Sequence, residues 1–89
     1  MTSRKNIYAD DRIFEMGKRL RKLRKSQGLT ISQLSEQIGL SGRMVSNYER
    51  GENAISLEII IKIYESKVFE DRSLEELFRF IVIEVYNSI

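Results

Sequence analysis

Signals that open and close helices recur along this chain at short intervals. Each of three glycines is followed within a few residues by a Ser or Thr that can cap a helix; the pairs are Gly28 with Thr30, Gly39 with Ser41, and Gly51 with Ser56. Glycine commonly closes a helix and a hydroxyl side chain commonly opens the next, so this alternation predicts short helices joined by short loops. Since the chain contains no Pro, no helix need be broken internally. These signals favour an all-α fold.

The spacing of apolar residues between these signals predicts five helices. The first is expected to begin near Asp11, the second to span 30–38 and the third 41–50. The fourth and fifth are expected to begin at Ser56 and at Ser73. Two of them start with a capping box, formed by Thr30 with Gln33 and by Ser73 with Glu76. The segment FRFIVIEVY could also be read as a strand, because it is rich in β-branched and aromatic residues. The capping box ahead of it and the lack of a partner strand favour a helix.

Periodicity also predicts the side chains that face the core. In the second and third helices they are Leu34, Ile38, Leu40, Met44, Val45 and Tyr48; in the fourth they are Leu57, Ile60, Ile61 and either Ile63 or Tyr64. The chain of 89 residues is expected to form one domain. Within it, residues 1–10 are predicted to be a flexible basic arm, 11–72 the main helical body, and 73–89 a terminal helix of the same domain.

The composition excludes several kinds of chemistry. The chain has no Cys and no His, which rules out disulfides, thiolate zinc sites, cysteine nucleophiles and histidine acid–base catalysis. Its acidic residues are scattered and it lacks a glycine-rich phosphate loop, so we predict a non-enzyme that needs no cofactor and no metal. With no apolar run long enough for a membrane span or a signal peptide, we expect a cytoplasmic protein without a membrane partner.

Charge is distributed unevenly along the chain. Nine of the fifteen Lys and Arg residues lie within the first 25 positions, against three of the thirteen acidic residues. A basic first quarter on a slightly acidic body is typical of a face that meets a polyanion. A solvated helix face that merely keeps the protein soluble would carry the same charges, and this pattern alone does not separate the two.

Two short predicted helices, at about 30–38 and 41–50, are joined by Gly39 and Leu40. This is the spacing of a helix-turn-helix, in which a glycine allows a sharp turn and the apolar residue after it enters the core. The inward positions of the second helix leave Gly42, Arg43, Ser46 and Asn47 facing outward.

Residues 12–78 resemble the lambda-repressor-like (Xre/Cro type) helix-turn-helix family. The resemblance rests on LRKLRKSQGLTISQLSEQIGLSGRMVSNYERGENAISLEIIIKIYE followed by SLEELF, in which every block of the family pattern occurs in order. It implies a five-helix DNA-binding domain that inserts its third helix into the major groove.

The resemblance also implies roles for individual residues. The base-reading residues would be Ser41, Gly42, Arg43, Ser46 and Asn47, and Arg43 would span two acceptors of one guanine. Phosphates would be contacted by Thr30, Ile31, Ser32, Arg50, Asn53 and Lys18. Arg24 and Glu49 would form an internal ion pair that clamps the first helix onto the third. The alternative for Arg43 is an exposed charged side chain that contacts no ligand.

Two positions depart from the family pattern. The family usually has Gln where this chain has Ile31, and a longer side chain, often Gln or Arg, where it has Gly42. One direct base contact would therefore be missing at Gly42. Most of the reading is expected to fall on Arg43 and Asn47.

The C-terminal segment is apolar over most of its length. Because Phe80–Ile83 covers a full turn, the predicted helix needs a second surface to cover it. We expect it to form a homodimer interface through Leu77, Phe80, Ile81, Ile83, Val85, Tyr86 and Ile89. The alternative is a helix buried within the monomer.

These features lead to a functional hypothesis. The chain is predicted to be a homodimeric, sequence-specific transcription regulator, a repressor or autoregulator that binds a palindromic site on double-stranded DNA. It resembles the small phage repressors, restriction–modification controllers and DNA-binding antitoxins. The alternative is a protein-interaction module on the same fold, such as an antitoxin whose terminal helix binds a toxin.

Overall fold

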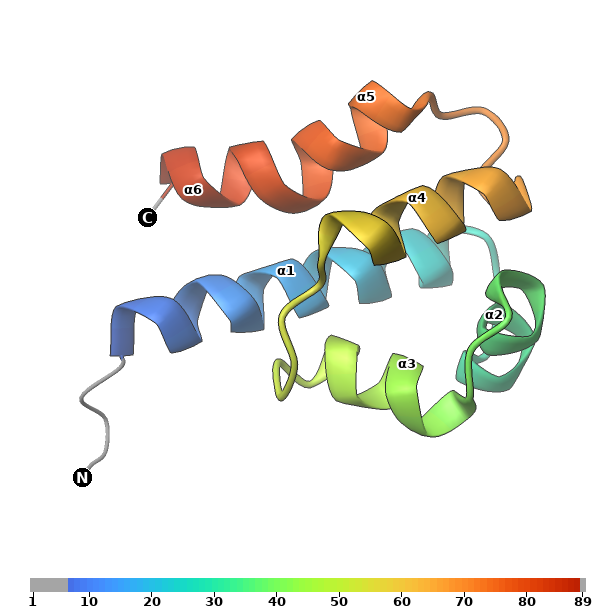
Figure 1. Ribbon diagram of the computed structural model, residues 1–89, viewed down its shortest axis with the longest axis horizontal. Coiled ribbons are helices and arrows are strands. Elements are labelled where there is room, and N and C mark those ends of the chain that lie inside the picture. The colour runs from blue at the N-terminus through green and yellow to red at the C-terminus, as the bar shows by residue number, and fades with distance from the viewer. Residues whose placement is uncertain (1–6, 89) are drawn as a thin grey trace.

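The structure is a computed structural model that describes residues 7–88. It is helical throughout its regular elements, which confirms the predicted all-α fold (Figure 1). The helices are α1 (Ile7–Ser26), α2 (Ile31–Ile38), α3 (Gly42–Glu49) and α4 (Leu57–Ser66), followed by a terminal helix in three parts: α5 (Leu74–Phe78), a π-helical turn η2 (Arg79–Ile83) and α6 (Glu84–Ser88). We call the continuous run from α5 to α6 the C-terminal helix. In the part of the chain described, no helix is both long and apolar enough to cross a membrane.

The first helix begins earlier than its periodicity indicates. It starts at Ile7, so residues 7–10, predicted to belong to the arm, are helical. The Arg4 and Lys5 of that arm lie outside the described residues. All four predicted hydroxyl caps are present: Thr30, Ser41, Ser56 and Ser73 each accept a hydrogen bond from a backbone N–H in the first turn of their helix.

The helices are arranged around α1. In Figure 1, α1 and α4 lie in the middle of the molecule, α3 lies on one side of them and the C-terminal helix on the other. The core is apolar and draws on every helix; its buried members are Met16, Leu20, Leu23, Leu34, Ile38, Val45, Tyr48, Ile55, Ile59, Ile60, Ile63, Phe69, Leu77, Ile81 and Val85. One continuous core therefore supports both sides of α1.

Several predicted inward residues were assigned to the wrong face. Met44 and Leu57 are exposed, and Ile61 is only half-buried. Of the two alternatives Ile63 and Tyr64, Ile63 is buried, as that prediction allowed. In α4 the buried face is formed by Ile59, Ile60 and Ile63. Ile55, in the loop before α4, is buried as well. Periodicity alone did not predict which face of α4 is buried.

The predicted dimer interface is corrected at three of its residues. Leu77, Ile81 and Val85 are completely buried within the chain's own core. The physical reason is that α4 packs against α5, which carries Leu77, while the long α1 runs beside η2 and α6, which carry Ile81 and Val85 (Figure 1). The wider π-helical turn reduces the rotation per residue, so residues four apart stay closer to one line along the buried face.

Phe80 is also engaged within the chain. Arg19 donates a hydrogen bond to the Phe80 carbonyl oxygen at 3.0 Å and another to Glu84 at 2.7 Å. The Arg19 guanidinium lies 4.7 Å from the centre of the Phe80 ring. Of the remaining predicted interface residues, Ile83 and Tyr86 are exposed, and Ile89 lies outside the described residues.

Candidate nucleic-acid interface

The α2–α3 unit has the geometry of a helix-turn-helix. Gly39 ends α2 in the left-handed conformation, with φ of 74°, a region that glycine occupies at little cost. The Leu40 N–H then donates to the Ser35 carbonyl at 3.0 Å, and Ser41 caps α3. Buried Leu34, Ile38 and Val45 hold the two helices together. The expected turn chemistry is confirmed.

Arg24 and Glu49 form the internal ion pair that the sequence predicts. The Arg24 guanidinium donates to both carboxylate oxygens of Glu49, at 2.7 and 2.9 Å, and to the Leu29 carbonyl at 2.7 Å. Both residues are only 7% exposed. The hydrogen bond with Glu49 raises the pKa of Arg24 above its ordinary value, although burial acts against it. The pair fixes the end of α3 against α1.

A second contact brings the backbones of α1 and α3 together, and sequence analysis missed it. A Cβ at Gly17 would lie 2.2 Å from the Tyr48 carbonyl oxygen and 2.8 Å from that of Glu49. Only glycine permits this approach. Gly51, with φ of 76°, ends α3 close to the backbone of Phe14. The available signal was a small residue, Gly17, on the inward face of a basic helix.

The outward face of α3 carries the predicted base-reading residues. Ser41 and Arg43 are exposed, while Gly42, Ser46 and Asn47 are half-buried. Arg43 lies in the first turn of α3 and close enough to Glu52 to lower the pKa of that carboxyl group, after the larger effect of Arg50. The arrangement brings Arg43, Ser46 and Asn47 onto one face.

The residues predicted to contact phosphate differ in how far their polar groups are already engaged within the chain. The N-terminus of α2 is exposed at Thr30 and Ser32, but the Thr30 N–H already donates to Gln33 at 2.9 Å within the capping box. That leaves the amides of Ile31 and Ser32 as the better candidates. Asn53 is exposed in the turn after α3. Arg50 is exposed as well, but its guanidinium is bonded to three neighbouring side chains.

Arg24 is paired with Glu49, and the Arg12 guanidinium lies over the Tyr86 ring; the other basic residues of α1 fall into two groups. Arg19 faces the C-terminal helix and is used there. Four others are exposed along one stripe, which we call the basic stripe: Lys18, Arg21, Lys22 and Lys25. Lys18 forms an ion pair with Glu15, with its Nζ 3.3 Å from a carboxylate oxygen. The stripe concentrates four cations on the outer face of the helix that carries α3.

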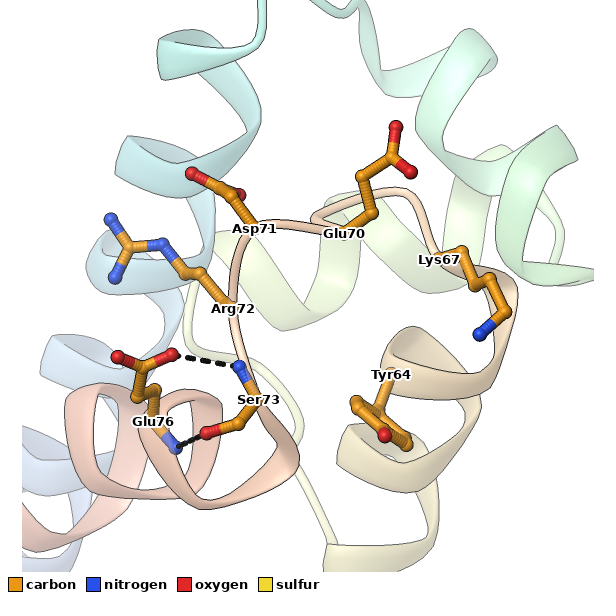
Figure 2. A pocket seen from close by; sticks show the side chains of 7 residues that line it. All are labelled: Tyr64, Lys67, Glu70, Asp71, Arg72, Ser73 and Glu76. Carbon is orange, nitrogen blue, oxygen red and sulfur yellow. Dashed lines mark hydrogen bonds between the residues drawn. The ribbon is translucent and has the colours of Figure 1, made fainter.

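A polar hollow of about 470 Å³ lies away from α3, between the end of α4 and the start of α5. Figure 2 shows its lining, in which Glu76 and Ser73 are joined by the two hydrogen bonds of the capping box. The side chains of Glu70, Asp71 and Lys67 point in different directions. Among the described residues, no group of acidic side chains has a geometry that could hold a metal ion.

Comparison with known proteins places these features in a family. Residues 20–65 match the family model for the helix-turn-helix, which covers all of α2 and α3. The chain is 36% identical, over 61 residues, to "Putative HTH-type transcriptional regulatory protein TK0539" of Thermococcus kodakarensis; the match covers 68% of this chain and 19% of that protein. It is 39% identical over 49 residues to a similarly named protein of Pyrococcus furiosus, covering 55% of this chain and 16% of the relative.

The chain thus spans about a fifth of the length of these relatives. No solved structure matches it at a significant level. The matched residues contain the capped turn, the Arg24–Glu49 pair and the outward face of α3 described above. On these grounds the chain belongs to the lambda-repressor-like, Xre-type helix-turn-helix family of DNA-binding transcription regulators.

Proposed function

We propose that this chain is a sequence-specific regulator that inserts α3 into the major groove of double-stranded DNA and acts as a repressor or autoregulator. The observation that carries the proposal is the contrast between the two sides of α3. Its inner side is fixed by the buried Arg24–Glu49 pair, and its outer side presents the exposed guanidinium of Arg43. A rigidly held helix with an exposed arginine in its first turn suits the reading of base edges.

The surroundings of α3 support the same approach to DNA. The exposed amide end of α2 suits an anionic phosphate, because the positive end of the helix dipole lies there. The basic stripe of α1 supplies further cations on the helix against which α3 packs. We assign these groups to the phosphate backbone, where they position the protein without reading sequence.

We further propose that the chain binds as a homodimer, through a surface that shares only Tyr86 with the predicted one. An apolar groove of about 390 Å³ lies between the first half of α1, the start of α4 and the C-terminal helix. Leu57, 57% exposed, and Tyr86, 50% exposed, line it together with Ile13, Phe78 and Val82. A second copy seated on this groove would place the two-fold axis beside the first half of α1.

Replacement of Arg43 by Ala tests base reading. Selection from random duplex DNA with the unaltered chain is expected to enrich a two-fold symmetric sequence. In Arg43→Ala we expect the preference at one base pair of each half-site to fall about 5- to 150-fold, which corresponds to the 1–3 kcal/mol of one bidentate contact. Enrichment of no sequence by the unaltered chain, or equal loss at every position in the variant, would contradict the proposal.

Replacement of Leu57 by Glu tests the homodimer. A charge introduced into the apolar groove of both copies is expected to weaken self-association by at least about 100-fold, because two carboxylates would lose their water on association. The one cation in the lining, Arg12, already lies over the Tyr86 ring, 4.6 Å from its centre. Tyr64→Glu is the matched control, since Tyr64 is an exposed apolar residue of α4 outside the groove. Sedimentation equilibrium measures both. A chain that is monomeric before substitution, or a dimer that Leu57→Glu leaves intact, would exclude this interface.

A further inference from the structure

Arg50 holds the two polar residues in the second half of the reading face. Its guanidinium donates one hydrogen bond to Ser46 Oγ at 2.6 Å and one to Asn47 Oδ1 at 3.0 Å. A third bond, from Nε to Glu52 Oε2 at 3.1 Å, fixes the guanidinium from the other side. Because the guanidinium is planar and its donors have fixed directions, three acceptors together define its position. We call this arrangement the Arg50 bracket.

Glu52 is itself anchored below Asn47. Its backbone N–H donates to the Asn47 carbonyl oxygen at 2.9 Å, which folds the turn after α3 back on the helix. The hydrogen bond from Arg50 lowers the pKa of the Glu52 carboxyl group, so this group stays charged where proteins normally work. The bracket thus consists of the chain's own residues, which set its orientation.

The bracket determines which polar atoms remain for a ligand. The Asn47 oxygen is turned toward a cation, which leaves the NH₂ group of the amide as its outward end. Accepting a bond from a cation also polarises the amide, making the NH₂ group a stronger donor and the oxygen a weaker second acceptor. In the same way, Ser46 Oγ accepts from Arg50 and keeps its O–H to donate. With the guanidinium of Arg43, the face then offers hydrogen-bond donors.

The bases differ in the hydrogen-bond donors and acceptors that their edges present in the major groove. Guanine presents two acceptors, adenine one acceptor and one donor, and cytosine one donor. An asparagine that pairs with adenine needs both its oxygen and its NH₂ group, whereas a donor-only amide fits guanine best. We propose that Arg50 is a specificity-determining positioning residue, and that through it this chain selects guanine rather than adenine at the base pair read by Asn47. This inference rests on the proposed function.

The experiment is selection from random duplex DNA with the unaltered chain and four variants. Asn47→Ala identifies the base pair that Asn47 reads, as the position where the preference disappears. At that position the unaltered chain is expected to prefer guanine over adenine by at least tenfold. In Arg50→Met, which frees the Asn47 oxygen, we expect the preference to shift to adenine. Asn47→Asp adds an independent variant: its second carboxylate oxygen is expected to favour the amino group of cytosine.

Lys25→Met is the matched control, because it also removes one exposed cation but from the basic stripe. It is expected to weaken binding equally for all sequences and to reduce the salt dependence by about one counterion, without a change in base preference. A preference for adenine in the unaltered chain, or an Arg50→Met variant that behaves like Lys25→Met, would overturn the inference and leave the proposed function standing. If the unaltered chain enriches no sequence, both fail.

Discussion

Glu49→Leu is expected to destabilise the chain by about 3–5 kcal/mol, the cost of leaving a buried charge without its partner. Arg24 is 7% exposed, and Glu49 accepts two of its three hydrogen bonds. For a domain of this size, each kcal/mol corresponds to roughly 4–8 °C in Tm. Thermal and urea unfolding followed by circular dichroism measure the loss, and DNA binding should weaken as well because α3 loses its anchor on α1.

The double variant Arg24→Met with Glu49→Leu separates two explanations of that loss. If the unpaired charge is responsible, removing both charges is expected to recover most of the stability, since apolar residues of similar volume often replace a buried pair without cost. A double variant as unstable as Glu49→Leu alone would instead attribute the loss to packing or to the bond between Arg24 and the Leu29 carbonyl.

Gly17→Ala is expected to destabilise the chain by about 3 kcal/mol, at the upper end of what overpacking usually costs. The new methyl group would lie 2.2 Å from the Tyr48 carbonyl oxygen, and backbone cannot move aside as a flexible side chain can. We expect α1 and α3 to separate, which would weaken DNA binding even where the variant stays folded. Urea unfolding and a binding titration on the selected site measure the two effects.

Gly42→Ala provides the matched control, because it makes the same chemical change on the facing helix. A Cβ at Gly42 meets its nearest neighbours, Ser35 Oγ and Ile31 Cγ2, only at 3.9 and 4.0 Å. Since alanine restricts the unfolded chain and suits a helix, we expect about 0.5–1 kcal/mol of added stability. Equal effects of the two substitutions would contradict the close approach at Gly17.

Local features of the fold follow well from the sequence. The caps at Thr30, Ser41 and Ser73 depend on residues three positions apart, and each is present. Burial was harder to predict, because it depends on which helix covers which face. The C-terminal helix illustrates this: Leu77 lies on α5, which packs against α4, and Ile81 lies on η2, which packs against α1. No local pattern specifies the position of either covering helix.

In the candidate site, too, some features could be predicted from the sequence and others could not. The Arg24–Glu49 pair could be expected, because the resemblance to a known family supplies a contact between distant parts of the chain. The roles of Gly17 and Arg50 could not, because they depend on distances: one on the separation of two backbones and the other on the direction of a guanidinium. Gly17 is marked in the sequence only as a small residue on the inward face of its helix, and the position of Arg50 gives no comparable signal.

The arrangement around α1 has a consequence for how this chain can vary in length. Gly17 is the residue of α1 that the backbone of α3 closely approaches. It lies one helical turn from Ile13, which lines the apolar groove. In the proposed dimer, that single turn connects the two-fold axis to the helix in the groove of DNA. One inserted residue between them would rotate one contact against the other by about 100° and shift it by about 1.5 Å. We therefore expect functional relatives to change side chains in this turn but to keep its number of residues.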